Sequence, residues 1–316
     1  MKIITITLNP AFDLHYDIPE FRAGAENYVE AVTVSAGGKS VNISRALSAN
    51  GIPNTACVIM GRKNAEPFQT KLREEGINYL PLTVDGSIRE NITVHDKDGK
   101  ETRISLNNFS LSAKILDQLY MDLHDLIEPD TVITLSGRLP NGIGNEEAKR
   151  FCCRLRELTP YLVVDSNSFS IKDLTEIGPW LIKPNESELQ AMFGTPMEDT
   201  TQITSAAASL CEQGISQVLV TLGGKGAVFV GYRHDTHRRI SATVTLPAVK
   251  PISTVGAGDS TIAGFLKGFY EHEPIEHCLK TAIAFGTAAC LREGTAPPLP
   301  ADVERIRATI RVTVNV

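Results

Sequence analysis

Short apolar runs of strand length alternate with stretches of helical periodicity along most of the chain. The strand-like runs cover 1–8, 56–61, 131–135, 161–165, 180–183 and 217–221. Apolar residues three or four positions apart predict helices at 38–50, 65–75, 112–127, 145–157, 186–193, 201–213, 257–270, 275–291 and about 301–311. Strands that are apolar on both faces must be covered on both sides. The pattern therefore predicts an α/β fold with a doubly wound, mostly parallel sheet flanked by helices.

Two segments, about 11–35 and 89–106, depart from this rhythm because polar and apolar residues alternate in them with a period of two. In the second segment, Asp98-Gly99 is a typical hairpin turn. The two segments predict a small antiparallel sheet that stands off the main body and acts as a lid or a dimer surface. Because no linker, repeat or low-complexity stretch divides the chain, residues 1–316 are expected to form one domain.

Composition narrows the range of partners. The chain has 316 residues, 42% of them hydrophobic, and a formal net charge of −6. This charge favours neither nucleic acid nor an anionic membrane as a partner. No apolar run approaches the roughly 20 residues of a membrane-spanning helix, and the first residues do not resemble a signal peptide, so a cytoplasmic location is expected. The six cysteines show no metal-binding spacing and are predicted to be buried thiols.

The strongest chemical signal is the sequence STVGAGDS at 253–260, which leads directly into an apolar helix. Gly256, Ala257 and Gly258 would present backbone N–H groups at the helix N-terminus, where they stabilise negative charge. Phosphoryl transfer needs such an anion site, and Asp259 is placed where a carboxylate can accept a proton from an attacking hydroxyl. The structural alternative is a glycine turn before a helix, with Asp259 only a first-turn acidic residue.

A second glycine-rich segment, TLGGKG at 221–226, follows a predicted strand. Thr221, Gly223 and Gly226 would form a loop that can approach a nucleotide closely. The structural alternative is a hairpin turn from 218–221 into 227–230. The segment lacks the spacing of a P-loop, which disfavours a P-loop nucleotidase.

The segment KPNESE at 183–188 also has two interpretations. In the functional one, Lys183 and Asn185 bind nucleotide phosphates, and Glu188 binds a magnesium ion through water. In the structural one, Asn185 and Glu188 form a capping box at the start of a helix.

Near the N-terminus, the sequence GGKSVN at 37–42 opens a predicted helix. Gly38 with Lys39 and Asn42 would suit a phosphorylated or hydroxyl-rich ligand at the helix N-terminus. Asp13 could accept hydrogen bonds from two sugar hydroxyls, unless it is simply a solvated loop residue.

These four segments, in this order, resemble the pfkB branch of the ribokinase-like carbohydrate kinases. The opening TITLNPAFD at 5–13 is most similar to the group of that family containing 1-phosphofructokinases and tagatose-6-phosphate kinases. The resemblance covers nearly the whole chain, and the segment at 253–260 is its most specific part. It implies ATP and Mg²⁺ as cofactors and a homodimer formed through the lid.

The resemblance also implies roles for individual residues. Asp259 matches the catalytic base, and residues 256–258 match the anion hole. The nucleotide and magnesium positions are matched by Lys183, Asn185, Glu188, Thr221, Gly223, Gly226, Ile283 and Thr287. The positions that bind the sugar phosphate are matched by Asp13, Gly38, Lys39, Asn42 and Arg89.

The chain departs from the family pattern at four positions. Arg292 lies where some relatives build a monovalent-cation site beside the anion hole, and activation by potassium stays an open alternative. Tyr28 stands where many members of the phosphosugar group have arginine, Ser40 replaces a glycine, and Arg138 replaces a serine that faces the sugar phosphate in related kinases. Our hypothesis is that Arg138 and Arg89 grip the substrate phosphate, because a guanidinium presents a planar fork that suits phosphate. The alternative is a surface Arg138 turned to solvent.

The expected reaction is the ATP-dependent phosphorylation of fructose 1-phosphate to fructose 1,6-bisphosphate. Tagatose 6-phosphate and fructose 6-phosphate are the alternative acceptors. A non-catalytic regulator that binds sugar or nucleotide is an alternative of a different class. A dinucleotide-dependent dehydrogenase is disfavoured because no GxGxxG follows the first strand.

Overall fold

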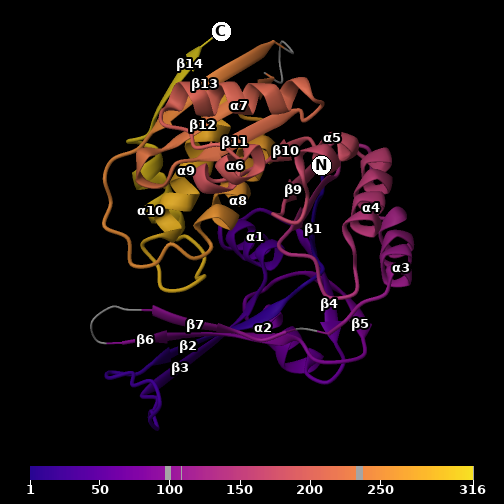
Figure 1. The fold of residues 1–316 in the computed structure, drawn as a ribbon, viewed down its shortest axis with the longest axis vertical. Helices are drawn as coiled ribbons and strands as arrows, with labels where there is room; N and C mark the ends of the chain where they lie inside the picture. The colour runs from indigo at the N-terminus through magenta and orange to yellow at the C-terminus, as the bar shows by residue number, and fades with distance from the viewer. Residues whose placement is uncertain (97–100, 108, 233–237, 316) are drawn as a thin grey trace.

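The computed structural model describes residues 1–96, 101–107, 109–232 and 238–315, and in them two sheets are present (Figure 1). The large sheet has ten strands in the order β14-β13-β12-β11-β10-β9-β8-β1-β4-β5. Its strands are β1 (Ile3–Thr7), β4 (Thr55–Gly61), β5 (Tyr79–Val84), β8 (Val132–Ser136), β9 (Leu162–Asp165), β10 (Leu181–Ile182), β11 (Gln217–Thr221), β12 (Ala227–Tyr232), β13 (Arg239–Thr245) and β14 (Arg311–Asn315). The seven strands from β11 to β5 are parallel, and β12, β13 and β14 extend the sheet antiparallel.

Helices cover both faces of this sheet, as the apolar pattern predicts. They are α1 (Lys39–Ala49), α2 (Ala65–Glu74), α3 (Ala113–His124), α4 (Asn145–Leu158), α5 (Ile171–Ile177), α6 (Glu186–Phe193), α7 (Thr200–Glu212), α8 (Ala257–Tyr270), α9 (Ile275–Ala289) and α10 (Pro300–Arg307). Successive strand residues enter opposite cores: Val132 and Val163 pack with α1, α8 and α9, whereas Ile133 and Val164 pack with α2, α3 and α4. The prediction of a doubly covered parallel sheet is therefore confirmed.

The elements that the sequence pattern missed are short or lie near the sheet edges. β5 is an edge strand that contains Pro81, and β14 is the edge strand at the other end. The seven-residue α5 is too short to show a helical period; a capping box between Ser170 and Asp173 begins it, and the left-handed Gly178 ends it.

The small sheet projects from one end of the molecule (Figure 1). Its order is β3-β2-β6-β7, formed by β2 (Ala11–Asp17), β3 (Ala31–Gly37), β6 (Arg89–His95) and β7 (Glu101–Ser105). The separate sheet is as predicted, with antiparallel pairs β2–β3 and β6–β7, but its two central strands β2 and β6 pair in parallel. The turn predicted at 98–99 lies outside the described residues.

Two further expectations can be compared with the structure. In the described part of the chain, we find no helix with the length and apolarity that crossing a bilayer requires. All six cysteines are free, and four of them are buried, whereas Cys153 and Cys290 are half-buried. The prediction of buried thiols is therefore right for four of the six.

Candidate active site

The residues singled out from the sequence gather where α1 and α8 begin, beside the carboxyl ends of β9, β10 and β11. Contacts between segments far apart in the chain bring them together: Lys39 reaches Asp165, and Asn42 reaches Asp259. Helix N-termini and the carboxyl ends of parallel strands are where α/β folds bind ligands, because unpaired N–H groups and loops converge there.

Asp259 lies in the first turn of α8, after a tight turn at Gly256. Gly256 has φ 75°, a left-handed conformation that favours glycine, and it is the N-cap of the helix. The Asp259 side chain is only 6% exposed, and Asn42 Nδ2 donates a 2.9 Å hydrogen bond to its Oδ2. Burial raises the pKa of Asp259 to about 7, although the Asn42 hydrogen bond and the charges of Lys39 and Lys183 act in the opposite direction. This carboxyl can therefore exchange a proton near neutral pH.

Asp165, at the end of β9, joins two lysines that the sequence had suggested for different ligands. Its Oδ2 lies 2.9 Å from Lys39 Nζ, and its Oδ1 lies 3.6 Å from Lys183 Nζ. Burial alone would raise the pKa of Asp165, but the two ammonium groups outweigh it and hold the pKa below its ordinary value. The sequence predicts Asp165 only as the last residue of a strand.

Lys183 also lies against the N-terminus of α8. A Cβ atom added at Gly258 would be 2.9 Å from Lys183 Nζ, so glycine leaves space for the ammonium at the helix end. The lysine and the first-turn N–H groups thus place positive charge in one location. Such a location stabilises an anion.

The other two predicted nucleotide segments lie side by side. Asn185 and Thr221 form a parallel bridge, and Thr221 N donates to Pro184 O at 3.0 Å. Asn185 and Glu188 form the capping box of α6, so the structural interpretation of this segment is correct. The hairpin interpretation is also correct for β11 and β12, which are joined through the turn at 223–225.

A cavity of about 310 Å³ lies among these segments. Its walls come from the loop after β11, the residues after β13, the start of α8 and the last turns of α9. They include the predicted residues Asn185, Thr221, Gly223, Gly226, Ala257, Gly258, Ile283 and Thr287. Structural roles at Asn185 and in the hairpin therefore coexist with positions in the cavity wall.

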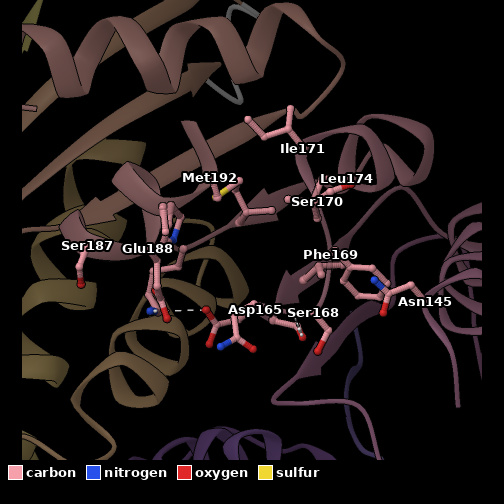
Figure 2. Close-up of a pocket in the computed structure, with 17 residues that line it drawn as sticks. Asn145, Asp165, Ser168, Phe169, Ser170, Ile171, Leu174, Ser187, Glu188 and Met192 are labelled. Atoms are coloured by element: carbon pink, nitrogen blue, oxygen red, sulfur yellow. Dashed lines mark hydrogen bonds and ion pairs between the residues drawn. The ribbon is translucent and has the colours of Figure 1, made fainter. Parts of the chain in front are cut away.

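Lys183 also lines a larger cavity, of about 590 Å³. Figure 2 shows the residues around it. Asp165 and Glu188 point into it from β9 and α6, and its apolar wall comes from the region around α5 and from Met192. Asp165, Lys183 and Glu188 line this cavity but not the smaller one. Gly258, against which Lys183 lies, lines the smaller cavity, so the two are close neighbours.

The small sheet contributes a second carboxylate. Asp13 on β2 accepts a 2.9 Å hydrogen bond from Asn91 Nδ2 on the adjacent β6. A Cβ atom at Gly37 would be 2.0 Å from Asp13 Oδ2, so the carboxylate lies directly on the backbone that leads into α1. Burial raises the pKa of Asp13, partly offset by the Asn91 hydrogen bond. Sequence analysis did not identify Asn91, whose register position opposite Asp13 requires knowledge of the strand pairing.

Three of the residues that depart from the family pattern have different environments in the structure. Ser40 is buried, and its Oγ accepts a hydrogen bond from the backbone of Ser136 at 3.1 Å, so it takes a structural role. Tyr28 is exposed. Arg138 is exposed as well. Burial lowers the pKa of Arg89, and repulsion from the charge of Arg138 contributes to that shift.

Polar atoms without protein partners are found in the same region. Among the described residues, Asn42 Oδ1, Asn91 Oδ1 and Arg89 Nε are buried and have no hydrogen-bond partner. Such groups are costly unless a ligand or water satisfies them. The arrangement combines a carboxyl with a pKa near neutrality, a cationic helix N-terminus and unsatisfied polar groups. It can deprotonate a hydroxyl beside a bound anion.

Comparison with known proteins identifies relatives that match nearly the whole chain. Residues 6–302 match the model of the pfkB family of carbohydrate kinases. The chain is 31% identical to the 1-phosphofructokinase of Escherichia coli K12, covering 96% of this chain and 97% of that protein, and 30% identical to the 1-phosphofructokinase of Bacillus subtilis, covering 92% and 93%. A crystal structure of phosphofructokinase-2 from Escherichia coli in complex with substrates and products superposes with a TM-score of 0.87 at 27% identity, covering 98% of this chain and 99% of that one. The chain therefore belongs to the pfkB family of carbohydrate kinases and is an ATP-dependent sugar phosphotransferase.

Proposed function

We propose that this chain transfers the γ-phosphoryl group of ATP to fructose 1-phosphate and forms fructose 1,6-bisphosphate, with Asp259 as the general base. The observation that carries the proposal is the position of Asp259, buried in the first turn of α8 beside the glycine turn and Lys183. The relatives named 1-phosphofructokinase support the choice of acceptor.

In this mechanism Asp259 accepts the proton of the acceptor hydroxyl as the oxygen attacks the γ-phosphorus in line. The carboxylate is competent because burial keeps its pKa near 7, which allows it to accept a proton at neutral pH. Asn42 orients the carboxylate through its 2.9 Å hydrogen bond. The backbone amides at 256–258 and the Lys183 ammonium stabilise the charge that develops on the phosphoryl group and on the departing β-phosphate.

The 310 Å³ cavity is the proposed nucleotide site, with Ile283 and Thr287 beside the base and Asn185, Thr221, Gly223 and Gly226 along the ribose and phosphates. Magnesium would neutralise the charge of the nucleotide phosphates where this cavity adjoins the larger one, which Glu188 lines. Among the residues described, no three His, Cys, Asp or Glu side chains cluster closely enough to hold a metal ion. Glu188 has one carboxylate oxygen committed to the capping box, and it suits an ion that is held by phosphates and reached through water.

The sugar phosphate would lie between α1 and the small sheet. Asp13 and Asn42 would bind its hydroxyls beside Gly38, where a φ of 119° and close contacts with Thr7 and Pro10 favour glycine. Lys39, Arg89 and Arg138 would hold its existing phosphate. The unpartnered Arg89 Nε and the repulsion between the charges of Arg89 and Arg138 support a shared anionic ligand, because an anion between two like charges stabilises both.

We further propose that residues 1–316 form one kinase domain in which the small sheet, about 11–35 and 89–106, acts as a lid. Asp13 lies on this sheet, so movement of the sheet would also move a residue proposed to bind the substrate. A lid that closes over the sugar excludes water and prevents wasteful hydrolysis of ATP.

The face of the lid opposite Asp13 supports a homodimer. The register places Val34, Leu14, Ile92 and Ile104 in one apolar row across the four strands, of which Val34 and Leu14 pack against the hydrophobic core of the main body. Ile104 is 49% exposed and Val32, on the same face, is 53% exposed. A second copy of the chain is the proposed occupant, and a relative of known structure, phosphofructokinase-2 from Escherichia coli, occurs in a tetrameric form. Sedimentation equilibrium should find a dimer that Ile104→Glu dissociates; a monomeric wild type would contradict the proposal.

The acceptor is tested by measuring ADP release with fructose 1-phosphate, tagatose 6-phosphate and fructose 6-phosphate under identical conditions. The expected result is the highest kcat/KM with fructose 1-phosphate. Fructose 6-phosphate is the main competitor, because a related crystal structure contains that sugar phosphate. A preference for either 6-phosphate would replace the proposed acceptor and leave the kinase class intact. No ADP release with any sugar phosphate, together with tight binding of one, would instead support a non-catalytic regulator.

A further inference from the structure

Arg45 is a buried charged residue with no part in the mechanism above. It lies on α1, one helical turn after Asn42, and its side chain is only 5% exposed. A buried guanidinium is costly unless its donors are satisfied, so the groups that satisfy them define what the residue holds in place.

Arg45 joins two segments that are distant in the sequence. Its Nε and Nη2 form a fork with the carboxylate of Glu75, at the end of α2, with a distance of 2.8 Å from Nη2 to Oε1. Its Nη1 donates to Thr295 O at 3.0 Å and to Thr295 Oγ1 at 3.2 Å. Thr295 belongs to the loop between α9 and α10, so Arg45 fixes this loop against α1 and α2.

The loop that Arg45 holds touches both parts of the site. A Cβ atom at Gly256 would lie 3.6 Å from Thr295 Cγ2, so Thr295 packs directly behind the glycine turn that opens α8. The preceding residue, Gly294, faces the small sheet: a Cβ atom there would be 2.5 Å from Nε2 of His15 on β2. Two consecutive residues therefore connect the turn at Gly256 with the strand that carries Asp13.

We propose that Arg45 is a positioning residue for phosphoryl transfer. It clamps Gly294–Thr295 between the small sheet and the turn at Gly256, and so fixes the orientation of the backbone amides that receive the developing negative charge. Amides stabilise a transition state most when they are already oriented towards the developing charge, because reorienting them during the reaction would cost free energy that offsets the stabilisation. The inference rests on the proposed function of the α8 N-terminus as the phosphoryl site.

Lysine at position 45 should support only part of the wild-type activity. A single ammonium group cannot present the planar fork to Glu75 and at the same time reach both oxygens of Thr295. Arg45→Lys should therefore keep the fold, because the charge opposite Glu75 is retained, and lower kcat to an intermediate value.

The test compares two ion pairs of similar burial. In the first variant, Arg45→Met is combined with Glu75→Gln so that no unpaired charge remains. The matched control combines Arg307→Met with Glu273→Gln, since this Arg–Glu pair is partly buried, with side chains 25% and 20% exposed, but links α10 to the α8–α9 loop. Each variant is assayed for kcat, for the KM of both substrates, for melting temperature, and for ADP affinity with and without aluminium fluoride and the sugar phosphate.

If Arg45 positions the anion site, the Arg45→Met, Glu75→Gln variant should have a kcat roughly 10- to 100-fold lower than the wild type. This is less than the effect of removing an oxyanion donor outright, because the amides remain but are less well oriented. The affinity of this variant for ADP alone should stay within about twofold of the wild-type value. The increase in ADP affinity that aluminium fluoride and the sugar phosphate produce in the wild type should be lost. The control pair should keep kcat and both KM values within about twofold, even when its melting temperature falls equally. Arg45→Lys provides the same comparison should the paired variant fail to fold.

Two results would overturn the inference: unchanged kcat in the Arg45 variants, or an equal fall of kcat in the control pair. The wild type serves as the internal check on the proposed function. An inactive wild type overturns the kinase proposal together with this inference, whereas an active wild type with unaffected Arg45 variants overturns the positioning role alone.

Discussion

The cavity beside the N-terminus of α8 is walled by backbone, glycines and uncharged side chains, whereas the neighbouring group around Lys39 and Asp13 is built from charged side chains on several elements. Backbone amides can bind phosphate in any nucleotide-dependent enzyme, but side chains must match a particular acceptor. This difference explains why the class of reaction can be inferred more readily than the substrate.

Among the changes that test this comparison of two regions, Asp165→Asn has the largest expected effect, because Asp165 connects the regions through Lys39 and Lys183. Asp165→Asn leaves the buried Lys183 and the partly exposed Lys39 without their common carboxylate, so both ammonium groups should move. We expect kcat/KM to fall by roughly 100-fold or more for ATP and for the sugar phosphate alike, the scale of a lost electrostatic contact to the phosphoryl group. Steady-state kinetics with each substrate varied in turn would test this. A loss confined to one substrate would show that the regions are independent.

Arg138 should affect only the acceptor side. Arg138→Ser removes one of the two guanidinium groups proposed to hold the substrate phosphate, so the KM of the sugar phosphate should rise about tenfold or more, the size of one charge-assisted hydrogen bond. The KM of ATP should not change. An unchanged KM for the sugar phosphate would mean that the exposed Arg138 is turned to solvent.

The pH dependence of kcat/KM should report the Asp259 carboxyl. A base must be deprotonated, and the folded enzyme holds its pKa at about 7, so activity should be constant above about pH 8 and fall tenfold per pH unit below 7. Asn42→Leu removes a hydrogen bond that favours the carboxylate, so the pKa of Asp259 should rise and the fall in activity should begin at a higher pH. If the activity instead falls around pH 6, and Asn42→Leu does not change that pH, the fall would report the second ionisation of the sugar phosphate.

The parts of the molecule that the sequence predicts correctly are those encoded locally. The strands and longer helices follow from apolar periodicity, and the glycine turn with Asp259 follows from eight consecutive residues. The capping box at Asn185 and the hairpin after Thr221 were foreseen as structural alternatives to ligand binding. Both segments form these structures and also line a cavity, because a cap or a turn leaves other faces of the same residues free.

The residues that sequence analysis missed act through contacts across long separations. Asp165 pairs with Lys39 across 126 positions, Asn91 bonds Asp13 across 78, and Arg45 reaches Thr295 across 250. None of them belongs to a glycine motif, and each acquires its partner only when the sheet order and the register are known. The parallel pairing of β2 with β6 was missed for the same reason, since alternation predicts strands but not their neighbours.

The central claim is that the carboxylate of Asp259 removes the proton of the acceptor hydroxyl at the N-terminus of α8. The most direct test is the rate of sugar bisphosphate formation by Asp259→Asn in a single turnover, with MgATP affinity measured on the same protein. The account predicts a rate lower by roughly 10²- to 10⁴-fold, the usual contribution of a general base, and MgATP affinity within about twofold of the wild type. A near-normal rate in this variant would contradict the account.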